Sequence, residues 1–171
     1  RLNRARADLR MGVPVVLQSG PHAALAVAAE TVSTDRLAAL RGAGPLVLAI
    51  TGRRAKTLKA RPYDGDLARL LVPADAGADW LRGVADPADD LEKPMKGPLA
   101  ALRDGSPDLA RAAVQLAKSA HLLPAAVLVD VSNGPERALN EGLTLLNLET
   151  ECAALGAEPT LAPVAAARLP M

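Results

Sequence analysis

The sequence has almost no aromatic residues: among 171 residues there is no phenylalanine, one tryptophan, Trp80, and one tyrosine, Tyr63. Half of the residues are nevertheless hydrophobic, so a core has to be built from alanine, valine, leucine and isoleucine. The one cysteine, Cys152, excludes an intramolecular disulfide and a multi-cysteine zinc site. A chain of this length suits one domain or slightly more, with a substantial core.

A strong excess of charge of one sign is also absent. The formal net charge is +1, which gives no bulk attraction to nucleic acid or to a membrane. No apolar run is long enough to span a bilayer and no signal peptide is visible, so we expect a cytoplasmic protein. Because the chain starts at Arg1 rather than at a methionine, we expect a fragment of a longer protein.

The clearest structural signal lies between Ser106 and Val131. Leucine and alanine recur there at helical spacing, and the polar residues fall on the opposite side. We expect Ser106 to cap this helix, with Pro107 at its first position. After Pro124, a continuous apolar run predicts a strand that is covered on both faces.

Periodicity predicts further elements on both sides of this unit. We expect helices over residues 2–11, 33–40, 52–59 and 79–85, and around Glu136 and Glu151. We expect strands over residues 13–17, 46–51, 66–72, 143–148 and an extended segment over 160–168; residues 23–30 fit either a helix or a strand. Since strands and helices alternate almost throughout, we expect an α/β (α+β) fold with a layered mixed sheet and flanking helices.

Residues capable of catalysis form no recognised motif. His22 lies in a loop beside Gly20 and Pro21 that holds no carboxylate, and we interpret it as an exposed histidine. His121 lies at a helix C-terminus, where a charged imidazole is favourable, so we expect it to cap the helix. Two histidines without a motif do not predict a metal site. Cys152 falls in a short apolar helix and is expected in the core.

Acidic residues are concentrated in two short stretches. Asp64-Gly65-Asp66 is typical of a turn and is too short for a calcium loop. The second stretch could gather a cation, but a charged surface loop is the favoured interpretation. Its members are Asp86, Asp89, Asp90 and Glu92.

A basic stretch, Gly52–Arg61, offers the one candidate for ligand binding. Arg53, Arg54 and Lys56 follow a predicted strand and open a helix, whose free N–H groups could receive a phosphate. The stretch would then bind a sugar phosphate or a nucleotide. It lacks the repeated glycines of a phosphate-binding loop, so a solvated helix face is the competing interpretation.

Several motifs resemble the 3,4-dihydroxy-2-butanone 4-phosphate synthase family, and the resemblance covers most of the chain. The similar segments are residues 7–17, residues 28–33 continuing through Gly44 to Thr51, and residues 112–117 with 122–131. That family makes the four-carbon precursor of riboflavin from ribulose 5-phosphate with magnesium, as a homodimer with its active site at the interface. The resemblance therefore implies a dihydroxybutanone-phosphate-synthase-like fold and a homodimer.

The residues that carry the family's activity are missing. The family has an acidic loop after its first strand, whereas Gln18 to His22 contains no carboxylate. The His-Thr-Glu that opens the family's central helix corresponds to Leu109, Ala110 and Arg111. An arginine in place of a carboxylate reverses the charge, so we expect no magnesium site and no catalytic residue in this segment.

In many bacteria this synthase domain precedes a GTP cyclohydrolase II domain, and residues 164–170 resemble the first strand of that domain. We expect a synthase-like domain over residues 1–163 and the start of a cyclohydrolase domain over 164–171, with the zinc site further downstream. Two functions remain open. The first is an accessory domain that dimerises and stabilises a riboflavin-pathway GTP cyclohydrolase II; the second is a ligand-binding domain with its site at Gly52–Arg61.

Overall fold

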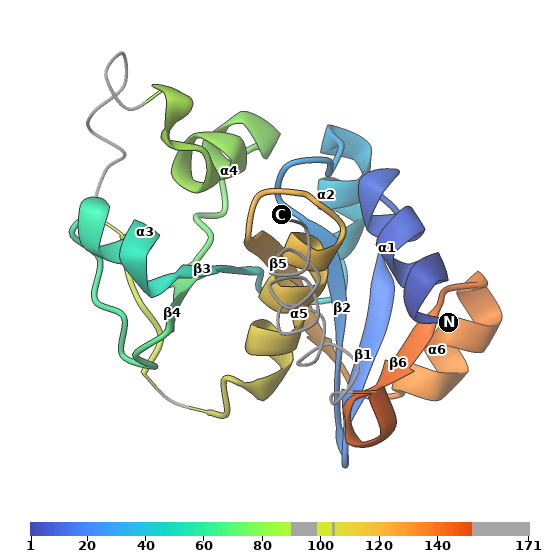
Figure 1. The fold of residues 1–171 in the computed structure, drawn as a ribbon. Helices are drawn as coiled ribbons and strands as arrows, with labels where there is room; N and C mark the ends of the chain where they lie inside the picture. The colour runs from blue at the N-terminus through green and yellow to red at the C-terminus, as the bar shows by residue number, and fades with distance from the viewer. Residues whose placement is uncertain (90–98, 104, 152–171) are drawn as a thin grey trace, which may run out of the picture.

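The computed structural model describes residues 1–89, 99–103 and 105–151, which form a six-stranded sheet with helices on both faces (Figure 1). The helices are α1 Leu2–Arg10, α2 Thr34–Arg41, α3 Gly52–Thr57, α4 Ala78–Ala85, α5 Asp108–Ser119 and α6 Gly134–Glu141, with a 3-10 turn at Pro87–Asp89. The strands are β1 Val15–Ser19, β2 His22–Ala28, β3 Val47–Thr51, β4 Leu67–Leu71, β5 Ala125–Val131 and β6 Leu145–Asn147. No helix in these ranges is long and apolar enough to cross a membrane.

The sheet is mixed, as the sequence predicts. Its strands lie in the order β4-β3-β5-β2-β1-β6. β5 pairs antiparallel with β2 on one side and with β3 on the other, so that Val127 lies opposite both Val27 and Leu48. β6 pairs in parallel with β1. The Thr144 hydroxyl donates a buried hydrogen bond of 2.7 Å to the Asp8 carboxylate, which ties α1 to the residues just before β6.

Each face of the sheet carries its own hydrophobic cluster. On one face, Leu116 of α5 is 0% exposed and shares a cluster with Leu128 of β5. On the other face, Leu37 of α2 and Leu81 of α4 share a cluster with Val127 of β5. Successive residues of β5 alternate between the two clusters, as side chains of a strand do. The strand is therefore covered on both faces, which confirms the reading of its continuous apolar run.

Alanine takes the place of aromatic residues where α5 meets the sheet. The helix buries Ala110, Ala112, Ala113 and Ala117. The strands contribute Ala24, Ala26, Ala28, Ala49 and Ala126 to the same cluster. Small side chains on both surfaces let the helix lie close to the sheet, so the interior is filled without large rings.

Single residues determine where two of the helices begin or end. The Ser33 hydroxyl accepts the backbone N–H of Arg36 at 3.2 Å and so caps α2. Gly12 follows α1 with φ of +75°, and a Cβ there would lie 2.6 Å from the carbonyl oxygen of Thr31. Only glycine fits this position, because a side chain would meet both backbone strain and a backbone atom.

Some predicted boundaries need correction. Pro107, rather than Ser106, is the N-cap residue of α5. The first strand begins at residue 15 instead of 13, because the Val13 N–H is bonded to the carbonyl of Asp8 in the turn that ends α1. Of residues 23–30, which fit either a helix or a strand, residues 23–28 belong to β2, whose two edges are paired with β1 and β5.

Other predictions lie outside the described residues. They include the role of Cys152, the extended segment 160–168, the domain boundary after residue 163, and the placing of Asp90 and Glu92. A helix begins at Leu148 and continues to Glu151, the last described residue, which agrees with the helix predicted there.

Burial on α5 predicts how two substitutions differ. Replacing Leu116, which is 0% exposed, by alanine should destabilise the protein by about 2–5 kcal/mol through lost contacts and a cavity. Replacing the exposed Lys118 by alanine should change the free energy of unfolding by less than about 0.5 kcal/mol. Urea denaturation of both variants gives the comparison, and equal midpoints would contradict the assigned faces.

Candidate functional site

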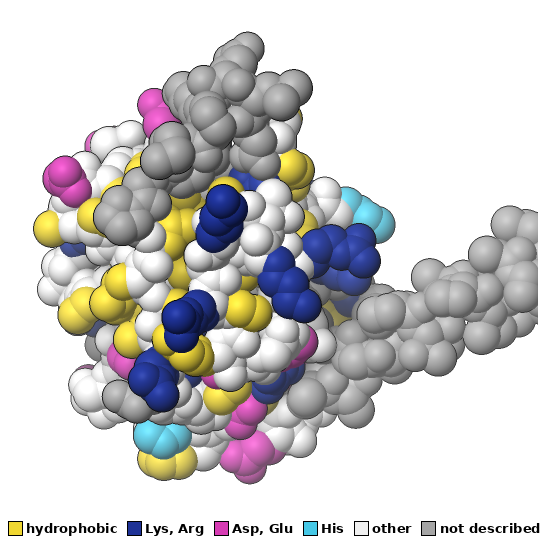
Figure 2. All heavy atoms as spheres, turned by 90° about the vertical axis from the view of Figure 1, so that its left-hand side faces the viewer, with side chains coloured by type: hydrophobic (Ala, Val, Ile, Leu, Met, Phe, Trp, Pro, Cys, Tyr) yellow, Lys and Arg dark blue, Asp and Glu magenta, His cyan; other side chains and the backbone are white. Residues whose placement is uncertain are grey.

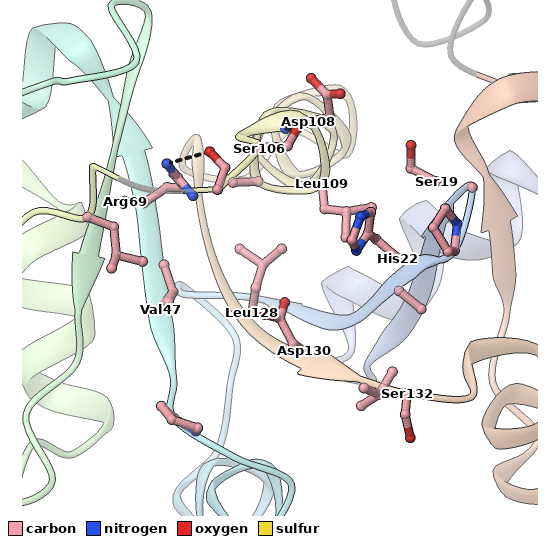
Figure 3. Close-up of a pocket in the computed structure, with 18 of the residues that line it drawn as sticks. Ser19, His22, Val47, Arg69, Ser106, Asp108, Leu109, Leu128, Asp130 and Ser132 are labelled. Atoms are coloured by element: carbon pink, nitrogen blue, oxygen red, sulfur yellow. Dashed lines mark hydrogen bonds between the residues drawn. The ribbon is translucent and has the colours of Figure 1, made fainter.

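A cavity of about 930 Å³ lies on the α5 face of the sheet, at the end of β5 (Figure 3). Leu128 and Asp130 of β5 line its floor, and Arg69 of β4 lies at one side (Figure 3). His22 and the turn between β1 and β2 lie at the other side, and the first residues of α5 lie above. Its volume and its mixed lining suit a small molecule.

The turn between β1 and β2 forms one rim of this cavity. Ser19 pairs with His22, so the turn itself consists of Gly20, with φ of +57°, and Pro21. The Gly20 N–H donates a hydrogen bond of 2.9 Å to the Glu149 carboxylate, which anchors the turn to the helix that follows β6. The turn carries no carboxylate of its own. The acidic group at this rim comes instead from Glu149, and it is already hydrogen-bonded.

Arg69 lies at the inner end of the cavity and is bonded to Asp64. Its guanidinium donates two hydrogen bonds to the carboxylate, at 2.9 and 3.3 Å, and one of 3.3 Å to the carbonyl of Gly105. Both side chains of the ion pair are 8% exposed. Removing one partner would leave a buried charge unpaired, so the pair fixes the loop before β4 against the cavity wall.

Arg111, in the first turns of α5, forms the second ion pair of this region. It donates hydrogen bonds of 2.7 and 2.9 Å to the two carboxylate oxygens of Asp66. The hydrogen bonds from Arg111 lower the pKa of Asp66 below its ordinary value, because they favour the ionised carboxylate. The same contact raises the pKa of Arg111. Arg111 thus joins the start of α5 to the turn before β4.

The carboxylates of this region do not fit a magnesium site. Magnesium needs several oxygen ligands converging on one point. Over residues 1–89, 99–103 and 105–151, no group of three or more His, Cys, Asp or Glu side chains could hold a metal ion. Asp64 and Asp66 are each bonded to an arginine. No chemical step in this region is therefore assigned to a metal.

The basic residues of α3 are not part of this cavity, and they separate into two groups. Arg54 donates hydrogen bonds to the carbonyls of Val84, Gly83 and Asp86, so its guanidinium holds the end of α4. Arg53 and Lys56 are exposed. The Thr51 hydroxyl accepts the Arg54 N–H at 3.1 Å and caps the helix. Ligand binding at Arg53, Arg54 and Lys56 stays a prediction.

Lys59 follows α3 in the left-handed region, with φ of +61°. The Ala60 N–H donates to the Ala55 carbonyl at 2.8 Å and the Lys59 N–H to the Lys56 carbonyl at 3.1 Å, the two bonds of a Schellman motif. Glycine is usual there, because left-handed backbone costs other residues about 1–2 kcal/mol. His121 occupies the same position after α5, with φ of +64°, so it caps that helix through its backbone.

Sequence reasoning did not predict that His22, Arg69 and Asp130 line one cavity. His22 was placed correctly as exposed, but its position at the cavity mouth depends on strand pairing. Asp130 is a charged residue at the end of an apolar strand, and Arg69 is a charged residue within one. This signal could have identified Arg69, which is buried, since a buried charge needs a partner, whereas Asp130 is exposed.

Comparison with known proteins gives one related sequence and several related folds. No family model matches the chain. A GTP cyclohydrolase-2 from Azospirillum brasilense is 35% identical over 136 residues, which is 77% of this chain. The matched region spans only 35% of the length of that relative.

The related folds are those of 3,4-dihydroxy-2-butanone 4-phosphate synthases. A cation-free form of that enzyme has a TM-score of 0.69 at 18% identity, over 92% of this chain and 98% of the other. The Candida albicans synthase has a TM-score of 0.66 at 19% identity, over 90% and 96%. RibBX, a two-domain synthase from A. baumannii, has a TM-score of 0.65 at 17% identity, over 86% and 55%. At these identities the comparison shows the fold.

The ion pair between Asp66 and Arg111 predicts a pH dependence. The folded protein binds a proton at Asp66 more weakly than the unfolded chain, so the pair stabilises the fold above about pH 4, the ordinary range of an aspartate. That contribution, about 0.2–1 kcal/mol for a partly exposed pair, should be lost as the pH falls through the lower pKa of the folded state. Asp66→Asn should lower the melting temperature at pH 7 and make little difference at pH 2.5.

The matched control is Asp75→Asn, an exposed aspartate with no partner among the described residues. Its melting temperature should follow that of the unaltered protein at both pH values. A loss caused by Asp66→Asn that is equally large at pH 2.5 would show that the ion pair is not its source.

Proposed function

The chain is a relative of GTP cyclohydrolase-2 that has the fold of 3,4-dihydroxy-2-butanone 4-phosphate synthases, and we propose that it is an accessory domain of a riboflavin-biosynthesis GTP cyclohydrolase II. In this role it dimerises, stabilises and positions the catalytic part, while the zinc chemistry resides in sequence outside this domain. The match spans 35% of the length of the relative, so the relative has further sequence that is long enough to contain a catalytic part.

The observation that carries the proposal is the bond between Arg111 and Asp66. At the start of α5, where the resemblance gives an active synthase a glutamate, this chain has a cation whose hydrogen bonds are used for structure. The nearby turn at Gly20 and Pro21 carries no acid. General acid–base catalysis needs a titratable group within reach of the substrate and free to exchange a proton. The fold is kept, and the groups for the synthase reaction are not.

Dimerisation follows from the resemblance, because the synthases are homodimers. In a two-fold dimer each copy offers the same surface, so an interface can persist after the catalytic side chains between the copies have changed. A domain that keeps its fold and its dimer interface could hold two catalytic parts at a fixed separation. The cytoplasm is the compartment that fits a biosynthetic role of this kind.

Loss of the synthase reaction is directly testable. Residues 1–171 incubated with ribulose 5-phosphate and magnesium should form product at least about 10² times more slowly than an active synthase, because general acid–base catalysis alone supplies about 10²–10⁴. Formate and dihydroxybutanone phosphate are the products to measure. Turnover within tenfold of an active synthase assayed in parallel would contradict the proposal.

The accessory role is tested on the longer protein that the proposal requires. That protein should release formate from GTP in a zinc-dependent reaction, whereas residues 1–171 alone should not. Deleting residues 1–151 from it should lower its sedimenting mass by more than the deleted residues account for, and should lower its melting temperature. If the deletion leaves the rate, the oligomeric state and the melting temperature unchanged, the accessory role is wrong.

A further inference from the structure

Five basic side chains outside the cavity belong to segments that adjoin the edge strand β4, because α3 packs against β4 and the segment before Arg103 is hydrogen-bonded to it. They are Arg53, Lys56, Lys59, Arg61 and Arg103, and we call them the basic surface. Each is exposed, and none makes a hydrogen bond or ion pair through its side chain within the described part of the chain. Figure 2 shows Lys and Arg side chains gathered over the middle of the face that carries α3.

The lack of partners at the basic surface contrasts with three arginines elsewhere in the described part of the chain. Arg69, Arg111 and Arg137 are each paired with a carboxylate. Arg53 and Lys56 are three residues apart on α3, so they lie on one side of the helix with their charges close together. Grouped like charges repel one another and weaken the folded state. Five exposed cations without a carboxylate partner therefore lie on α3, on the residues that follow it and at Arg103, although the net charge is only +1.

Lys59 adds an independent observation, because it occupies a left-handed position that favours glycine. Its side chain extends from a backbone conformation that is strained for any residue with a Cβ. Strained positions of this kind are concentrated at functional sites. The lysine charge thus lies at a position where a glycine would be more stable.

We infer that the basic surface binds an acidic segment of a partner protein, through carboxylates of Asp and Glu. Flexible Lys and Arg side chains suit carboxylates that are presented along a polypeptide. Tyr63 is the exposed aromatic residue in the segments that carry the surface, and its ring already has the Arg103 guanidinium 5.1 Å from its centre. No ring is left as a platform on which nucleic-acid bases could stack.

A membrane fits this surface less well than a protein. Proteins that lie on a bilayer insert large apolar side chains beside their basic residues. The exposed large apolar or aromatic side chains of the described residues are Met11, Tyr63, Leu71 and Leu139, and of these only Tyr63 belongs to the segments of the basic surface. The surface therefore offers one aromatic side chain, which already contacts Arg103, rather than a group of apolar anchors.

The test measures fluorescence anisotropy of a labelled peptide with eight consecutive glutamates, titrated with residues 1–171. Binding should weaken steeply between 50 and 300 mM salt, as contacts between exposed charges do. Arg53→Glu with Lys56→Glu should weaken it about tenfold, since exposed charge pairs are each worth a few-fold. Arg36→Glu is the matched control, because it reverses an exposed charge on α2 and should leave the affinity within about twofold.

Lys59→Gly separates function from stability. The substitution removes both the left-handed strain and one charge of the basic surface. It should therefore raise the melting temperature and lower the affinity for the peptide about threefold. His121→Gly relieves the same strain outside the surface, and it should raise the melting temperature with no change in affinity. This comparison does not depend on the proposed function.

Three results would overturn the inference. One is a Lys59→Gly variant that is more stable and binds the peptide as well as the unaltered protein does. Another is an equal loss of affinity in Arg36→Glu. The third is tighter binding of a labelled eight-nucleotide single-stranded RNA, or of vesicles rich in anionic lipid, than of the peptide at the same salt concentration.

Discussion

The whole architecture depends on burying β5 on both faces with small side chains. β5 pairs with β2 and β3, and its residues contribute alternately to the two hydrophobic clusters. Without phenylalanine, contact between α5 and the sheet has to come from close approach, which the alanines on both surfaces allow. A larger side chain at Ala113 or Ala126 would separate helix and sheet and open voids around its neighbours. Packing at this one contact fixes where α5 begins, and hence where the cavity lies.

Arginine supplies much of the connection between elements that the small side chains cannot reach. Arg54 and Arg82 hold α4, the first by donating to carbonyls at the end of that helix and the second by donating to the carbonyls of Glu30 and Val32. Arg41 donates to the carbonyls of Pro73 and Ala76 just before α4. The planar guanidinium has several donors in a fixed arrangement, so one side chain can satisfy several backbone acceptors. Arg54, which the sequence suggests as a ligand-binding residue, therefore serves to hold α4 in place through hydrogen bonds to its backbone.

The sequence predicts the helices and strands, but it does not predict the ion pairs and strand pairings that join them. The apolar run at 125–131 and the helical spacing before it identified β5 and α5, because both depend on local periodicity. The layered α/β class followed from the alternation of elements. By contrast, the partners of Arg69 and Arg111 are Asp64 and Asp66, and nothing in the Asp-Gly-Asp turn distinguishes it from an ordinary exposed one. The position of His22 beside the cavity also depends on pairing between strands, which local patterns do not encode.

The parallel pairing of β1 with β6 has a consequence for how the chain is made. The edge of β1 that receives β6 stays open until residues near 145 have been synthesised, on the order of ten seconds after β1 itself at ribosomal rates. The bond between Asp8 and Thr144 closes over a similar separation, 136 residues. Contacts this distant in sequence slow folding, and an open edge can pair with another chain. During synthesis, the newly made domain therefore carries an unprotected strand until β6 emerges.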